Sequence, residues 1–115
     1  MIILDATTKS LEIKLAGAVT TNQLPWTVAY LDYLDSDQSV SDIAGVDGAT
    51  NDGTAVSMVA APSAGHTRHI KRLTVYNADT AAATVTVQVN DNSTKRVLYT
   101  ITLAVGDNLI DDPES

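Results

Sequence analysis

His66 and His69 are the only histidines of the 115-residue chain, so they are the first candidates for a metal ligand or a general base. A spacing of three on an extended chain places the two side chains on opposite faces, and they cannot then chelate one ion unless the segment curls. Serines are plentiful, but no Gly-x-Ser-x-Gly turn occurs and nothing places a base beside any of them. The chain has no cysteine, which removes a thiol nucleophile and cysteine-bound zinc. The sequence therefore predicts a protein that is not an enzyme and has no catalytic residue, metal or cofactor.

Carboxylates gather in the middle of the chain, where oxygen ligands for calcium would be expected. The patterns are Asp-x-Asp at 35–37 and Asp-Gly-x-x-Asn-Asp-Gly at 47–53. Neither has the glycine at the sixth position and the closing glutamate of an EF-hand loop. Solvated loop acids are the favoured interpretation. A carbohydrate- or calcium-binding module that uses this region, with Trp26 and Tyr30 or Tyr33 as a sugar platform, stays as an alternative.

Charge is distributed unevenly along the chain. The formal net charge is −7, which repels phosphate backbones and argues against nucleic acid as a partner. No Lys or Arg lies between Lys14 and Arg68, whereas five of the seven basic residues lie between Arg68 and Arg96. One interpretation is an acidic solvated loop region opposite a mildly basic strand face. The other is that copies of the protein meet acidic edge to basic edge, because complementary patches set the register between subunits.

Composition favours strands and a thin core. Thr and Val are abundant, and both are strand formers. The chain has no Phe, two Met and one Trp, so few bulky side chains are available for a core and an oligomer would supply further burial. No apolar run approaches the ~20 residues of a membrane span, and the start lacks the basic and apolar regions of a signal peptide. The sequence predicts one all-β domain, made in the cytoplasm and used without export or membrane contact.

Alternating apolar residues place the clearest strands between Arg68 and Ile110. Val85, Val87 and Val89 alternate with polar residues, and so do the odd-numbered residues from 97 to 103. The Asn-Asp-Asn-Ser run at 90–93 predicts a hairpin turn between these two strands. A third strand begins near Arg68. Its residues Leu73, Val75 and Asn77 share one face while Ile70 is out of phase, which predicts a bulge near 71–72. The three strands are expected to form a β-meander at the centre of one sheet.

The first 26 residues allow two interpretations. Leu11, Ile13 and Leu15 alternate with charged residues in a clear strand, but the stretch 16–23 lacks apolar anchors. The segment 1–26 is either an assembly arm lying across another subunit or the first strand of its own sheet. After Pro25, residues 26–35 are expected to form a strand, 36–53 a long surface loop with at most one edge strand, 54–60 a strand, 108–110 a last short strand and 111–115 an acidic tail.

Several runs resemble small virion structural proteins of tailed bacteriophages. They are Leu-Ala-Gly-Ala-Val-Thr-Thr-Asn-Gln-Leu-Pro at 15–25, Ala-Ala-Pro-Ser-Ala-Gly-His-Thr-Arg-His-Ile-Lys-Arg-Leu-Thr-Val-Tyr-Asn-Ala-Asp-Thr at 60–80, Val-Thr-Val-Gln-Val-Asn-Asp-Asn at 85–92 and Leu-Ala-Val-Gly-Asp-Asn-Leu at 103–109. The resemblance covers most of the chain, although the chain stops soon after Leu109, without the further glycine-rich segment of longer members. Such proteins have no active site to carry over. The resemblance implies a non-enzymatic capsid decoration or minor capsid protein.

These observations predict a single antiparallel β-sandwich of seven or eight short strands, jelly-roll-like or immunoglobulin-like, with an extended N-terminal segment. The expected partners are the phage major capsid protein, whose lattice the protein would stabilise on the capsid surface, and other copies of the chain in a trimer. A tail, neck or fibre component is the alternative within the same class. The residues predicted at protein interfaces are Leu11, Ile13, Leu15, Leu24, Trp26, Arg68, Lys71 and Arg72.

Overall fold

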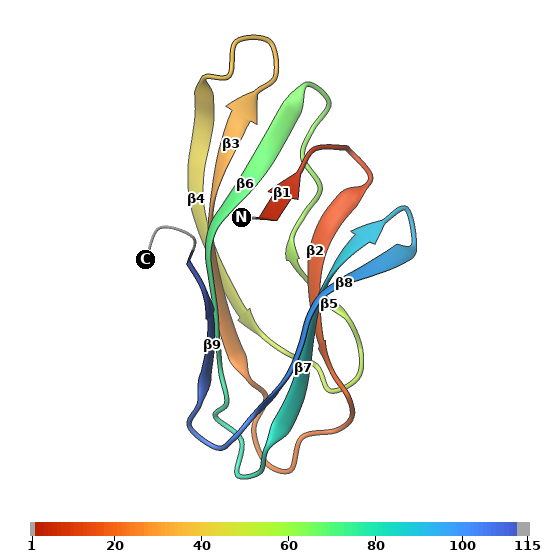
Figure 1. Cartoon of the computed structure of the whole chain (residues 1–115), viewed down its shortest axis with the longest axis vertical. Helices are drawn as coiled ribbons and strands as arrows, with labels where there is room; N and C mark the ends of the chain where they lie inside the picture. Colours follow the sequence, from red (N-terminus) through yellow and green to blue (C-terminus); the bar gives the residue numbers. More distant parts are fainter. Residues whose placement is uncertain (1, 113–115) are drawn as a thin grey trace.

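Two antiparallel β-sheets packed face to face make up the protein (Figure 1). The computed structural model describes residues 2–112, which form nine strands and no helix. The strands are β1 (Ile2–Leu4), β2 (Lys9–Leu15), β3 (Pro25–Leu34), β4 (Val40–Ala49), β5 (Val56–Val59), β6 (His66–Tyr76), β7 (Ala83–Asp91), β8 (Thr94–Leu103) and β9 (Asn108–Asp111). The predicted all-β sandwich is confirmed.

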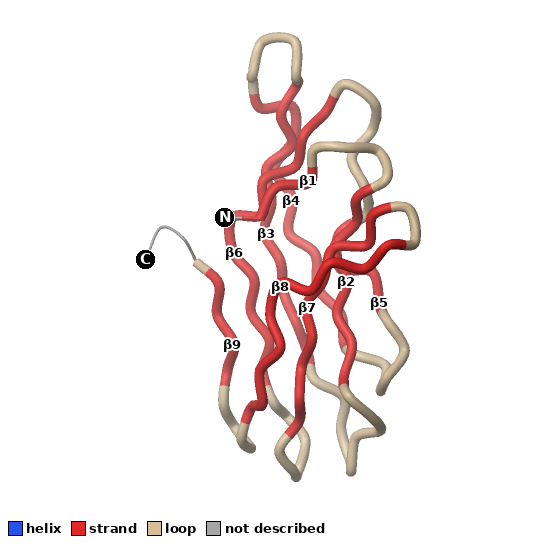
Figure 2. The backbone as a smooth tube through the Cα atoms, turned by 45° about the vertical axis from the view of Figure 1, so that its right-hand side comes forward, coloured by secondary structure: helices blue, strands red, loops and turns tan. Residues whose placement is uncertain are grey.

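Each sheet has a defined strand order (Figure 2). Sheet A has the order β1-β6-β3-β4, and β9 also pairs with β6. Sheet B has the order β5-β2-β7-β8. The Cα atoms span 47 × 31 × 18 Å, so the sandwich is thin, as a core built from Val, Leu and Ile requires. The buried apolar core comprises Ile2, Leu4, Leu11, Ile13, Leu15, Leu24, Trp26, Val28, Met58, Val59, Ile70, Leu73, Val75, Val85, Val87 and Leu103.

The N-terminal segment belongs to its own subunit in this structure. β1 pairs with β6 of sheet A, and β2 lies between β5 and β7 in sheet B. Leu11 and Ile13 are fully buried and Leu15 nearly so, because they point between the two sheets. The structure therefore has the own-sheet arrangement and not the assembly arm considered for residues 1–26.

Hydrogen bonds to two carboxylates hold the stretch 16–24, which lacks apolar anchors. Asp79 accepts the backbone N–H groups of Thr20 (2.9 Å), Thr21 (2.7 Å) and Asn22 (3.1 Å). Asp52 accepts the N–H of Val19 (3.0 Å) and the side-chain amide of Gln23 (2.7 Å). The segment can cross from sheet B to sheet A over the end of the sandwich because its backbone donors are satisfied.

The strand predictions between Arg68 and Ile110 are partly confirmed. β3 pairs with β6 from Ala29↔Arg72 directly to Tyr30↔Ile70, so Lys71 is the extra residue of the predicted bulge. The β7–β8 hairpin turns through Asn92 and Ser93, both at positive φ as in a type I′ turn. The predicted meander is wrong, because β6 lies in sheet A whereas β7 and β8 lie in sheet B. The chain crosses the sandwich between Tyr76 and Ala83.

The edge strand that the prediction allowed within residues 36–53 is present, but it takes up most of the segment, so the long surface loop is not formed. Ten of these residues make β4, an edge strand that pairs along almost the whole of β3. The sequence of this segment is typical of a loop, because its small and acidic residues obscure the alternation of apolar and polar side chains that indicates a strand. Gly48 is required in this strand, since a Cβ atom there would lie 2.6 Å from Cζ2 of Trp26. The short strands β5 and β9 agree with the predictions for 54–60 and 108–110. The acidic tail predicted at 111–115 lies outside the described residues after Asp112.

Candidate functional site

A serine, a histidine and an aspartate meet at one end of sheet A, and no sequence motif predicts this arrangement. Asp32 Oδ1 lies 2.9 Å from Nδ1 of His66, and Oγ of Ser41 lies 3.4 Å from the same Nδ1. A catalytic triad needs the serine and the carboxylate on different ring nitrogens, so that the imidazole can pass a proton between them. Here both contact Nδ1, and the Ser41 hydroxyl donates instead to the backbone carbonyl of Asp32 (3.1 Å). The arrangement is not a nucleophile–base relay.

Arg68 completes this cluster and is used within the subunit. Its Nε lies 3.4 Å from Oδ2 of Asp32, and its Nη1 donates to the carbonyl of Ala60 at 2.8 Å. Its guanidinium carbon lies 4.9 Å from the centre of the Tyr30 ring, within the range of a cation–π contact. Arg68 therefore fastens β6 to β3 and to the segment after β5. Its predicted place at an interface with another protein is not supported, because its side chain is only 17% exposed.

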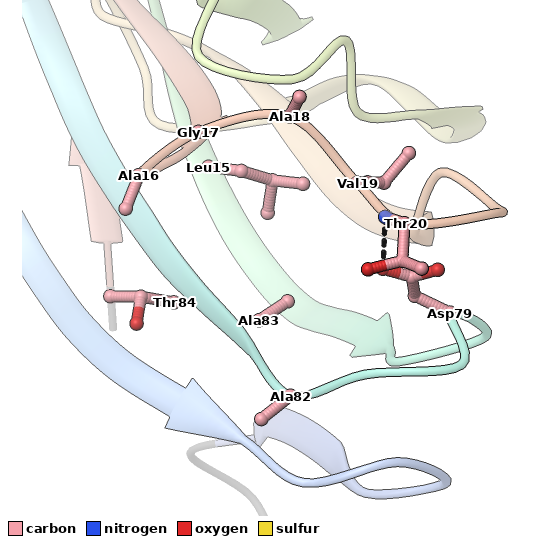
Figure 3. A pocket seen from close by; sticks show the side chains of 10 residues that line it. All are labelled: Leu15, Ala16, Gly17, Ala18, Val19, Thr20, Asp79, Ala82, Ala83 and Thr84. Carbon is pink, nitrogen blue, oxygen red and sulfur yellow. Dashed lines mark hydrogen bonds between the residues drawn. The ribbon is translucent and has the colours of Figure 1, made fainter.

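A cavity of about 200 Å³ lies at the opposite end of the sandwich, between the 16–20 segment and the start of β7 (Figure 3). Asp79 is the ionisable residue of its lining. All of the hydrogen bonds that Asp79 accepts come from backbone N–H groups, those of Thr20, Thr21, Asn22 and Thr80. The hydrogen bond from the Thr20 N–H has the largest effect, and together with the other three it lowers the pKa of Asp79 to about 2. Four backbone N–H groups of the fold therefore already compensate the charge of this carboxylate.

The acidic residues of the central region are dispersed. Asp32 pairs with His66 and Arg68, Asp52 holds the 19–23 segment, and Asp37 accepts from Ser39. Within residues 2–112 no group of three or more His, Asp or Glu side chains is placed to hold a metal ion. Trp26 cannot form a sugar platform, since it is only 5% exposed and packs in the core.

The outer face of sheet A carries a row of apolar side chains. Ile3 of β1 is paired with His69 of β6, His69 with Leu31 of β3, and Leu31 with Ile43 of β4. These partners lie side by side across four strands on the face that points away from sheet B. Ile43 is 74% exposed and Ile3 is 47% exposed. An edge-to-edge apolar row on a solvent-facing sheet surface is unusual, because this face of an antiparallel sheet is normally polar.

Further apolar residues extend the row over the same face. The Tyr33 ring lies against the His69 ring, tilted by 46° with 4.4 Å between centroids, and Val40 is the partner of Tyr33 on β4. Tyr76 is two residues from the outward-facing Thr74 of β6, and Ile110 of β9 is the register partner of Thr74, so both lie on this face. Nine large apolar side chains of the described residues are exposed, and five of them belong to this face: Ile3, Val40, Ile43, Tyr76 and Ile110.

A shallow depression of about 350 Å³ lies beside the apolar row. Its floor is flat because Ala29 and Gly45 are register partners with almost no side chain. Arg72 and Asp47 flank it, and the Arg72 side chain is 54% exposed while its Nη1 lies 3.2 Å from Asp112. The outer face of sheet A thus combines an apolar row, a hollow and an exposed guanidinium. This combination is suited to another protein surface.

The predicted interface residues divide into two groups. Five apolar ones, listed earlier for the N-terminal segment and β3, are core residues in this structure: Leu11, Ile13, Leu15, Leu24 and Trp26. Of the basic ones, Arg72 lies on the outer face of sheet A, Lys71 is the bulge residue and Arg68 points to the other side. The bulge separates the three, so they do not form one cluster. Sequence reasoning missed Ile3 and Ile43, whose signal was an apolar residue at an outward position.

Comparison with known protein families, with curated proteins and with solved structures gives no match. Among the described residues no helix is long and apolar enough to cross a membrane. The structure therefore defines the class of the protein as a β-sandwich with exposed apolar side chains on the outer face of sheet A.

Proposed function

We propose that the protein is a non-enzymatic structural protein of a virion. It is a minor capsid or decoration protein that binds the major capsid protein lattice through the outer face of sheet A and stabilises the head. The observation that carries this proposal is the apolar row from Ile3 to Ile43, which sits on a sheet surface that would otherwise be polar. The resemblance of the chain to small virion proteins of tailed bacteriophages supports the same assignment.

The side chains on the outer face of sheet A indicate which groups the capsid surface would present to it. The centre of a protein interface is depleted of charge and rich in apolar and aromatic groups, as this row with Tyr33 and His69 is. The flanking Arg72 suits a carboxylate on the partner, since exposed guanidinium groups pair with carboxylates in two-pronged hydrogen bonds. A rigid sheet presents these groups without ordering a loop, so little conformational entropy is lost on binding.

Binding of labelled protein to tailless heads that lack this protein tests the proposal. The matched variants are Ile43→Asp on the outer face of sheet A and Val105→Asp in the β8–β9 turn, where the side chains are 74% and 58% exposed. Both should fold, because neither residue is buried. We expect wild type and Val105→Asp to bind in hundreds of copies per head. Ile43→Asp should bind roughly thirtyfold more weakly, the equivalent of about 2 kcal/mol at an interface centre.

Three outcomes would contradict the proposal. Equal binding by both variants would remove the outer face of sheet A from the contact. Failure of the wild-type protein to bind tailless heads would remove the capsid assignment. Binding in few copies, together with co-purification with tails, would favour the tail, neck or fibre alternative.

A further inference from the structure

The lateral edges of the sandwich carry two long unpaired strands. β4 ends sheet A on one side and β8 ends sheet B on the other, and each has ten residues. These strands lie at opposite sides of the sandwich, because β4 contacts β5 whereas Tyr99 of β8 hydrogen-bonds to Asp111 of β9. Each leaves one row of backbone N–H and C=O groups without a strand partner. Such edges are templates for pairing with another chain.

The two edges have opposite charge. β4 contains Asp42 and Asp47, both exposed, and no Lys or Arg. β8 contains Lys95 and Arg96, both exposed, and no Asp or Glu. Lys95 contacts Glu12 at 2.7 Å, whereas Arg96 has no ion pair within residues 2–112. The β8 edge therefore retains at least one uncompensated cation, and the β4 edge has two carboxylates to meet it.

Apolar surface accompanies the charges on β8. Val97 is 59% exposed, and Leu98 and Ile101 are each 40% exposed. These exposures are high for a strand that faces a core on one side, because β8 has no neighbour beyond β7. Val97, Leu98 and Ile101 belong to sheet B and are therefore separate from the outer face of sheet A.

We infer that copies of the chain associate head to tail, with the β4 edge of one copy against the β8 edge of the next. Pairing β4 with β4, or β8 with β8, about a two-fold axis repeats the same charge on both sides, whereas β4 with β8 sets acid against base. In a head-to-tail assembly, both edges of every copy are paired only when the copies close into a ring. The predicted trimer is then a closed ring of three. This inference concerns contacts between copies and does not depend on which shell the protein binds.

Bulges limit where the two edges can meet. Ser41 is the extra residue in β4, because Asp32 pairs with Asp42 but Tyr33 pairs with Val40. Leu98 is the extra residue in β8, because Val87 pairs with Tyr99 but Gln88 pairs with Val97. The regular ladder positions are therefore 42–49 on β4, and 94–97 and 99–103 on β8. A bulge also bends the strand locally, which opposes indefinite stacking of edges and favours one defined partner.

Cross-linking between single-cysteine variants tests the inference, since the chain has no cysteine of its own. Gly45→Cys places a thiol on β4, where a Cβ atom meets nothing within 4 Å, and Thr100→Cys places one on the exposed part of β8. With a short bifunctional thiol reagent, we expect the mixture of the two variants to give cross-linked dimers and each variant alone to give none. A chain with both cysteines should give a ladder that ends at the trimer.

Charge reversal supplies the second measurement, made by sedimentation without any shell present. Asp42→Lys with Asp47→Lys, or Arg96→Glu alone, should weaken association more than tenfold, and the three changes together in one chain should restore it. Far-ultraviolet circular dichroism checks that each variant is folded. Cross-linking within a single variant, no cross-linking in the mixture, association indifferent to these charges, or a wild-type protein that is monomeric at all concentrations would each overturn the inference.

Discussion

Asp79 illustrates how much of this fold depends on single polar residues. It is 3% exposed and accepts four backbone N–H groups, three of which belong to the segment between β2 and β3. The sequence shows only an aspartate after Asn77-Ala78, which is typical of a turn. Three of its four partners lie more than fifty positions away, and no local pattern indicates them. Sequence reasoning therefore found the segment 16–23 unanchored, whereas its anchors are carboxylates.

Acid should destabilise the protein through Asp79. Its pKa falls from 3.8 to about 2 on folding, chiefly through the hydrogen bond from Thr20, so the carboxylate stabilises the fold at every pH above about 4. That contribution is lost as the pH falls from about 4 to about 2. We expect Asp79→Asn to lower the thermal midpoint at pH 6 by several degrees and to flatten its decrease between pH 4 and pH 2. Asp47→Asn on the exposed edge is the control, and equal acid profiles for wild type and Asp79→Asn would contradict the assignment.

The two glycines of β4 should respond differently to a methyl group. Gly48→Ala places a Cβ atom 2.6 Å from the Trp26 ring, whereas Gly45→Ala meets nothing within 4 Å. We expect Gly48→Ala to cost about 1–3 kcal/mol of unfolding free energy, the usual cost of overpacking, and Gly45→Ala to change it by less than about 0.5 kcal/mol. Urea titrations of both variants measure this difference. Two equal values would mean that Trp26 can move away from β4.

At the scale of strands, the structure separates two positions that alternation alone treats as equal. Val87 is fully buried in β7, whereas Ile101 is 40% exposed in β8 at the sheet edge. Alternation alone places both side chains on a core face, where an aspartate would prevent folding. Only Val87→Asp should do so, because an unpaired buried carboxylate costs several kcal/mol against a total stability of about 5–15. Circular dichroism of the soluble fraction distinguishes the two, and a folded Val87→Asp would contradict the core position of β7.

Some features of the strands could be predicted and others could not, for physical reasons. The bulge at Lys71 was visible because Ile70 is out of phase with Leu73, and the β7–β8 hairpin was visible because Asn92 and Ser93 suit positive φ. The crossing from β6 to β7 was not visible, since a strand has the same period of two in either sheet. Asn77 was placed on the core face correctly, but its bonds to the carbonyls of Ala81, Leu103 and Ala104 depend on distant turns.

At the scale of the whole molecule, removal of the N-terminal residues distinguishes an assembly arm from a core strand. Leu4, Leu11 and Ile13 are fully buried, and β2 is central in sheet B. Removing residues 1–24 would leave β5 and β7 without the strand between them. We expect the truncated protein to be insoluble or unfolded, as judged by circular dichroism after refolding. A soluble, strand-rich remainder that no longer self-associates would instead support the arm interpretation.

A side-chain hydrogen bond joins the two sheets at the edge where β8 and β9 lie together. The Tyr99 hydroxyl of β8 donates to Asp111 of β9, and this hydrogen bond to the carboxylate raises the pKa of Tyr99 to about 12. The opposite edge has no such bond between described residues of β4 and β5. Among the described residues, a side-chain hydrogen bond therefore links the two sheets on the β8–β9 side of the sandwich and not on the β4–β5 side. The candidate interaction face lies on sheet A, which contains both β4 and β9.

The pairing of β1 with β6 and of β2 with β7 also governs when the protein can fold. Each pair joins the beginning of the chain to a strand made much later, Ile2 with Ile70 and Lys9 with Asp91. Contacts between such distant residues require long loops to close first, which slows folding. While the chain is being translated, β2 has no β7 to pair with, and its apolar residues stay exposed on the ribosome. The two sheets can therefore assemble only after β6 and β7 have been synthesised.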